Sequence, residues 1–174
     1  MTDRFGHHLR LDQIGEGQRV DLVADEAECD AICKRLGLNA LDRLEAHALL
    51  SRTGDKVRAT GRLGASVTQN CVVTGEPVAA HIDEPFELIF MPEQAAAGAE
   101  HEIELGEQDC DIVFYDGAAI DLGGAIADTL ALGLDPYPRS ASAESALKEA
   151  GVLSEEQAGP FAVLAALKGR KDDD

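Results

Sequence analysis

The sequence predicts an α+β fold: a mostly antiparallel, curled sheet or partial barrel with two or three peripheral helices. Three observations favour this class. Apolar and polar residues alternate over much of residues 41–91, which is typical of strands with one buried face. Two other segments carry apolar residues at helical spacing directly after an aspartate. The strand-like segments follow one another without intervening helices, unlike the regular alternation of α/β proteins.

The first elements lie before residue 40. Residues 9–22 contain two short apolar runs separated by glycines, which predicts a strand, a turn and a second strand. A helix is predicted over residues 25–36, because Asp25 is a good N-cap and Glu28 completes a capping box with it. Gly37 suits the left-handed residue that ends a helix.

A β-hairpin is predicted next. Residues 41–50 and 57–67 alternate in polarity, and the polar stretch SRTGDK joins them. Two further strands are predicted after the hairpin, one begun by the apolar run at Cys71 and the second ending near Met91. Pro85 cannot donate to a strand ladder and therefore indicates a bulge or a sheet edge.

The second half begins with an acidic, Ala/Gly-rich segment at 92–109, which we expect to form a mobile loop. The stretch CDIVFYDG predicts a short strand with Ile112 and Phe114 on one side. A helix is predicted over 121–133 with Asp121 as its cap, and the two prolines of DPYPR end it.

Three features are predicted at the C-terminal end: a short helix at 143–150, a helix starting at Pro160 whose apolar side docks on the body, and a disordered tail at 169–174. We find no internal repeat. Residues 1–174 are therefore interpreted as a single domain.

The formal charge of −18 is unevenly distributed. Residues 63–138 contain no Lys or Arg, but they contain 15 acidic residues. Such a surface repels phosphate backbones, because nonspecific nucleic-acid affinity comes from Lys and Arg, and it favours basic partners. The alternative is that the acidic surface only promotes solubility.

The composition also predicts a location and a redox state. No apolar run is long enough to cross a membrane, and the start MTDRFGHHLR lacks the apolar core of a signal peptide, so we expect a cytoplasmic protein. The four cysteines show no CxxC pair and are expected to be reduced. A zinc site built from Cys29 and Cys33 with Cys71 or Cys110 is the alternative to cysteines that pack in the core.

No enzyme motif is recognisable. The sequence has no GxSxG, no HExxH and no phosphate-binding loop. We therefore expect no enzymatic activity and no cofactor, with a metal-dependent enzyme such as a nuclease as a remote alternative.

Two groups of residues are candidates for binding. Lys56, Arg58 and Arg62 share one face of a strand and form a candidate RNA-contacting group, against the alternative of an ordinary solvated face. Candidate partner-binding residues are Tyr137 and Arg139, presented between prolines, and the acidic pair Glu84 and Glu87. Tyr137 can instead simply pack against the body.

Several stretches carry a family resemblance. GRLGASVTQNCVVTGEPV at 61–78, the strand ending FMPE, IDLGGAIADTLALGLDPYPR at 120–139 and PFAVLAALKGRK at 160–171 resemble, in this order, the YceD family, in the branch common in alphaproteobacteria. The resemblance implies a role in the accumulation or processing of large-subunit (23S) rRNA and no known enzymatic chemistry.

Set against the family it resembles, this chain differs at two places. Many members carry C-x-x-C where this chain has Cys71 and Thr74, and a further cysteine cluster after the position of Arg139, where this chain has none.

The prediction is a non-enzymatic ribosome-biogenesis factor that acts through a basic ribosomal protein or rRNA-processing factor. A direct rRNA-binding protein is the second possibility.

Overall fold

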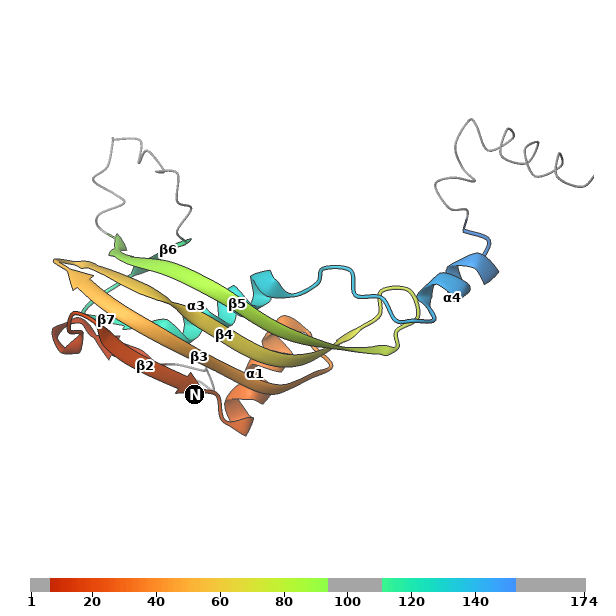
Figure 1. Ribbon diagram of the computed structural model, residues 1–174, viewed down its shortest axis with the longest axis horizontal. Coiled ribbons are helices and arrows are strands. Elements are labelled where there is room, and N and C mark those ends of the chain that lie inside the picture. Colours follow the sequence, from red (N-terminus) through yellow and green to blue (C-terminus); the bar gives the residue numbers. More distant parts are fainter. Residues whose placement is uncertain (1–6, 94–110, 153–174) are drawn as a thin grey trace, which may run out of the picture.

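Five strands form one mixed sheet, and two short strands pair beside it. The computed structural model describes residues 7–93 and 111–152. The sheet order is β2-β3-β4-β5-β6, antiparallel except for the parallel pair β5–β6, and β1 pairs with β7 (Figure 1). The strands are β1 His8–Arg10, β2 Gln18–Val23, β3 Ala40–Thr53, β4 Lys56–Asn70, β5 Pro77–Pro92, β6 Asp111–Tyr115 and β7 Ala119–Asp121. The helices are α1 Glu26–Leu36, α3 Leu122–Gly133 and α4 Ala143–Glu149, with a 3-10 helix at Leu11–Gln13.

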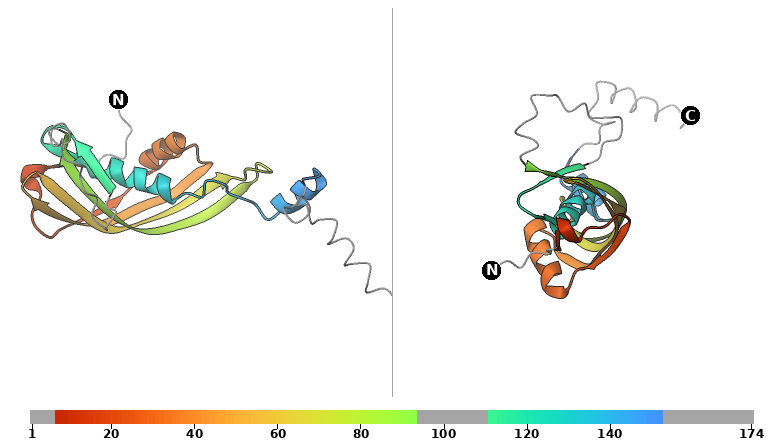
Figure 2. Two further views of the ribbon diagram at one scale, coloured as in Figure 1. Left: turned by 90° about the horizontal axis from the view of Figure 1, so that it is seen from above. Right: turned by 90° about the vertical axis from the view of Figure 1, so that its left-hand side faces the viewer.

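The sheet curves around α3, and the core lies between them (Figure 2). On β3, β4 and β5 alternate residues point inward and are buried, as the polarity pattern predicts. Ile126 and Leu130 of α3 are fully buried in the same cluster as Phe90 of β5. The α+β class is confirmed. Within the described residues β2 and β6 remain separate edges, so the sheet does not close and the partial barrel is not confirmed.

Local signals in the sequence place both longer helices. The Asp25 carboxylate accepts from the backbone N–H of Glu28 at 2.8 Å, and the Glu28 carboxylate accepts from the N–H of Asp25 at 3.0 Å. This is the predicted capping box, and Gly37 ends α1 with φ of 66°. Asp121 caps α3 by accepting from Gly124 N–H at 2.9 Å.

The long antiparallel region is also as predicted, with one correction. The turn at Gly54, whose φ is 62°, joins β3 to β4. The predicted strand at Cys71 is wrong: residues after Asn70 form a turn, and one strand, β5, runs without interruption to Pro92. Pro85 pairs with β4 where β6 no longer covers β5, so the predicted sheet edge is confirmed.

The short strands pair with partners distant in the sequence. The predicted strands within residues 9–22 exist as β1 and β2, but β1 pairs with β7 and β2 with β3. On β6, Tyr115 is buried and its hydroxyl donates to the backbone oxygen of Asp55 at 2.6 Å. Ile112 and Phe114 share the opposite, outward side, as their spacing requires, and Phe114 is 48% exposed.

After α3 the chain forms an arm that reaches the turn between β4 and β5 (Figure 1). The Gln69 side chain donates to the Asp135 oxygen, and Val72 N–H donates to the Pro138 oxygen, both at 2.9 Å. The arm ends in the predicted short helix, α4. The predicted loop at 92–109 lies outside the described residues except for its first two positions. The predicted helix from Pro160 and the predicted tail at 169–174 lie wholly outside them. None of the described helices is long and apolar enough to span a membrane.

Candidate functional site

The outward side of the five-stranded sheet, here called the convex face, carries a nearly balanced set of charges. No described helix covers it (Figures 1 and 2). Its cations are Arg19, Arg43, Lys56, Arg58 and Arg62, and its carboxylates are Asp21, Glu45, Asp83 and Glu87. In a chain of net charge −18 this balance means that the excess of carboxylates lies elsewhere.

The candidate RNA-contacting residues all lie on this face, but two of them are already paired. Arg62 donates to the Asp83 carboxylate through Nε at 3.0 Å and through a terminal nitrogen at 2.8 Å. Arg58 lies 3.1 Å from Glu87 Oε1, an ion pair without hydrogen-bond geometry. Lys56 has no ion pair within residues 7–93 and 111–152. Only Lys56 therefore presents an uncompensated charge among the three.

The candidate acidic pair is split between two sides of the sheet. Glu87 lies opposite Thr60 on the convex face, whereas Glu84 lies opposite the buried Leu63 and points to the concave side. There it is exposed beside the end of α3, where a Cβ at Gly133 would be 3.7 Å from its Cγ. Strand residues three apart point to opposite faces, so these two carboxylates cannot form one surface.

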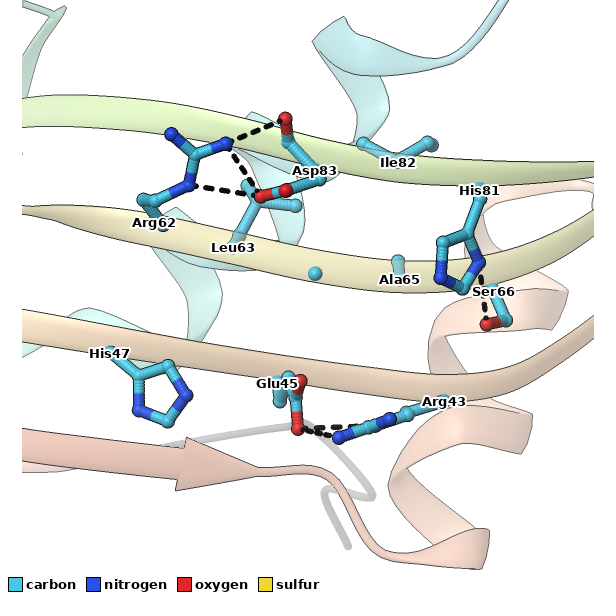
Figure 3. A pocket seen from close by; sticks show the side chains of 11 residues that line it. Arg43, Glu45, His47, Arg62, Leu63, Ala65, Ser66, His81, Ile82 and Asp83 are labelled. Carbon is cyan, nitrogen blue, oxygen red and sulfur yellow. Dashed lines mark hydrogen bonds and ion pairs between the residues drawn. The ribbon is translucent and has the colours of Figure 1, made fainter.

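A shallow depression of about 320 Å³ lies on the convex face around Gly64 (Figure 3). Gly64 stands directly between Glu45 on β3 and Asp83 on β5, so its missing side chain leaves the hollow. Figure 3 shows Arg62 directed at Asp83 on one side, and His81 beside Ser66 on the other. The Ser66 hydroxyl and His81 Nδ1 are 3.1 Å apart.

The same hollow is rimmed by two further charged contacts. Arg43 pairs with Glu45 at 2.5 Å, and His47 Nδ1 lies 2.7 Å from Asp21. The hydrogen bond to the Asp21 carboxylate raises the pKa of His47 above its ordinary value. The charged groups around this hollow therefore already have partners.

A second depression, of about 490 Å³, lies beside α1 and is acidic. We call it the α1 depression; its lining includes Asp25, Glu26, Asp30 and Asp42. Asp30 and Asp42 are exposed and make no ion pair within the described ranges. The sequence analysis missed this surface, because Asp42 is separated from the helix by a loop and a strand start.

The predicted zinc pair, Cys29 and Cys33, lies in the same region. Cys29 is buried, which raises the pKa of its thiol, and Cys33 Sγ donates to the Leu38 oxygen at 3.3 Å. Over the part of the chain that the structure describes, no group of three His, Cys, Asp or Glu side chains is placed to hold a metal ion. Cys110 lies outside that part.

Tyr137 and Arg139 are both exposed on the arm, on either side of the buried Pro138. Tyr137 is 71% exposed, and its N–H donates to the Asp135 carboxylate at 2.9 Å. The alternative of a packed tyrosine is therefore wrong. Both residues stay candidates for partner binding.

A polar cluster that the sequence analysis did not predict joins the arm to the turn after β4. Thr74 and Ser140 hydroxyls are 3.1 Å apart, and Ser142 donates to the Glu76 carboxylate. Burial opposes a charged Cys71 thiol, but hydrogen bonds from Ser140 and Thr74 outweigh it and lower its pKa to about 6. The hydroxyls thus occupy the two regions where the resemblance implies cysteines in relatives.

The comparisons with known proteins gave one result. A family model described as large ribosomal RNA subunit accumulation protein YceD matches residues 59–168. This range runs from β4 through the arm and includes both the turn after β4 and α4. The chain matches no curated protein and no solved structure.

Proposed function

Because the chain belongs to the YceD family of large ribosomal RNA subunit accumulation proteins, we propose that it supports accumulation of large-subunit (23S) rRNA without enzymatic activity, by binding a basic protein. The partner would be a ribosomal protein or an rRNA-processing factor. Membership of the alphaproteobacterial branch is a prediction from the resemblance.

The observation that carries this proposal is the separation of charge in the fold. The convex face holds five cations and four carboxylates, so the large net negative charge is carried by the rest of the molecule. The exposed Asp30 and Asp42 in the α1 depression are part of that charge. A basic protein is attracted to such a surface, and the attraction is screened by salt.

The charge balance also bears on why a protein partner is favoured over RNA. Phosphate binding depends on Lys and Arg side chains that are free to replace counterions. Arg58 and Arg62 are each held by a carboxylate of β5. An RNA strand would have to displace these carboxylates before its phosphates could bind, whereas a basic protein can bind the α1 depression, where Asp30 and Asp42 make no ion pair within the described residues.

Within residues 7–93 and 111–152, one contact resembles catalytic chemistry, the pair Ser66 and His81. Serine nucleophiles need a base, a group that orients the base, and backbone or side-chain donors for the oxyanion. Ser66 lies in the middle of β4, between β3 and β5, where the backbone groups are used by the ladders. This placement favours a non-catalytic role for the pair.

The proposal is tested by titrating the protein against basic large-subunit ribosomal proteins and against 23S rRNA fragments at two salt concentrations. An α1-side variant, Asp30→Lys with Asp42→Lys, should lose the protein partner. A convex-face variant, Lys56→Ala with Arg58→Ala and Arg62→Ala, is the matched control and should keep it. Salt-sensitive binding of RNA with no protein partner would reject the proposal.

Direct contact with rRNA is the second candidate, and one observation favours it. The parallel pairing of β6 with β5 places Phe114 beside Met91 on the convex face, one strand beyond the neighbourhood of Lys56. An exposed aromatic ring near a cation is the combination on which unpaired bases stack. Phe114→Ala and the convex-face variant should then both weaken rRNA binding, while the α1-side variant should not.

A further inference from the structure

Among the strands that the structure describes, β2 forms one edge of the five-stranded sheet. Strand β2 pairs with β3 on one side, and none of the described strands pairs with the other. Figure 1 shows β2 along the border of the sheet. An edge strand offers a row of backbone donors and acceptors to another strand, and short length or charge usually protects it.

We propose that β2 pairs antiparallel with β2 of a second copy of this chain, in a two-fold dimer centred on Val20. In this register Val20 lies opposite Val20 of the second copy. Arg19 then lies opposite the second copy's Asp21, and Gln18 opposite its Leu22. The two sheets become one continuous sheet, and the interface is the same patch on both copies.

Charge complementarity selects this register. Arg19 and Asp21 are exposed and point to the convex face, two positions apart and of opposite sign. Residues directly opposite in an antiparallel pair have Cβ atoms about 4.5–5.5 Å apart, so the dimer forms two ion pairs across its axis. A shift that centres the pairing on Arg19 or Asp21 places like charges opposite each other. A shift by a single residue sets convex-face side chains against concave-face side chains.

The existing contacts of Asp21 are compatible with the dimer. Its Oδ1 lies 2.7 Å from His47 Nδ1, on the neighbouring strand. A carboxylate has two oxygens with about four acceptor positions, so Asp21 can accept from its own His47 and from Arg19 of the second copy. Charges on an edge strand usually prevent two copies from pairing. Here Arg19 and Asp21 meet like charges only in the registers centred on Arg19 or Asp21, so they do not prevent pairing centred on Val20.

The size of the contact predicts a weak dimer. Strand β2 has six residues, and stable interfaces bury about 1,200–2,000 Å² in total. Association should therefore depend on concentration and appear in the micromolar range or above. This inference is independent of the proposed role in rRNA accumulation.

Sedimentation equilibrium of the full chain over a wide concentration range tests the dimer by a charge swap. Wild-type protein should dimerise. Arg19→Asp alone places two carboxylates opposite each other, and Asp21→Arg alone places two guanidinium groups opposite each other, so each should remain monomeric. An equimolar mixture of the two variants should form a one-to-one dimer. Lys56→Asp changes charge on the same face away from β2 and is the matched control that should still dimerise.

Three results would overturn the proposal: a wild-type protein that stays monomeric at the highest concentration, single variants that associate like the wild type, or a mixture that fails to restore the dimer. Circular dichroism and thermal unfolding of each variant show whether the fold is intact. Slower hydrogen exchange of the outward amides of β2 at high concentration would locate the contact and separate it from an interface elsewhere.

Discussion

Replacement of Gly61 by alanine tests the packing of the long antiparallel strands directly. Gly61 lies on β4 opposite Ala48, with its missing side chain directed inward. A Cβ at this position would be 1.9 Å from the backbone oxygen of His47 and 2.9 Å from Phe86 Cζ. The phenyl ring can shift, but the His47 oxygen belongs to the β3–β4 ladder and moves only with the strand.

The expected effect follows from this geometry. Adding a methyl group to a well-packed interior costs about 1–3 kcal/mol and occasionally more, and a clash with backbone belongs at the upper end. Alanine restricts the unfolded chain more than glycine does, and this offsets about 0.4–1 kcal/mol of that cost. We therefore expect Gly61→Ala to lower the free energy of unfolding by about 2 kcal/mol or more.

Gly64→Ala is the matched control. The nearest atoms to a Cβ there are Glu45 Oε1 at 3.5 Å and Cγ at 3.6 Å, which are ordinary contacts. The free energy of unfolding of the Gly64→Ala variant should stay within about 1 kcal/mol of the wild-type value. Urea unfolding followed by circular dichroism measures both variants. Equal stabilities of the two variants would refute the close approach of β3 to β4 at Gly61.

Three further predictions concern local contacts. Asp25→Ala removes the N-cap of α1 and should cost about 1 kcal/mol in urea unfolding; no loss would contradict the capping box. The pKa of the Cys71 thiol is about 6 in the folded protein against an ordinary 9.0. The Cys71 thiolate therefore adds to the free energy of unfolding, and this contribution is complete above pH 9 and is lost as the pH falls through 6. Ser140→Ala should raise that pKa, measured by thiolate absorbance, and an unchanged value would exclude the hydrogen bond. Asp21→Asn should lower the pKa of His47, followed by NMR titration, and an unshifted titration would argue against their contact.

The sequence predicts the parts of the fold that depend on neighbouring residues. The capping box at Asp25, the stop at Gly37 and the cap at Asp121 each involve residues within four positions of a helix end, and all three are confirmed. The hairpin of β3 and β4 is also local, because a two-residue turn at Gly54 sets its register.

The parts that depend on distant residues could not be predicted. Periodicity identifies β6 as a strand, but it does not reveal that β6 lies parallel to β5 and places Phe114 on the convex face. The charge pattern along the chain predicts one acidic surface, yet the fold sends Glu84 and Glu87 to opposite faces and pairs Glu87 with Arg58. The absence of Lys and Arg in one stretch therefore does not describe the surface, because neighbouring strands supply the cations.

The polar cluster at the turn after β4 shows the same limit. Thr74 and Ser140 are 66 positions apart, and no sequence pattern joins them. The resemblance to relatives with cysteines in both regions was a usable signal, since residues that replace a shared site tend to remain close in space. It could have pointed to this contact before the structure was known.

The most direct test of the account is the ratio of large-subunit to small-subunit rRNA in cells that lack the native protein and express a variant in its place. The account predicts that the α1-side variant, Asp30→Lys with Asp42→Lys, fails to restore large-subunit rRNA, while the convex-face variant restores it as fully as the wild type. Normal rRNA with the α1-side variant and a deficit with the convex-face variant, both stably folded, would contradict the proposal of a basic protein partner.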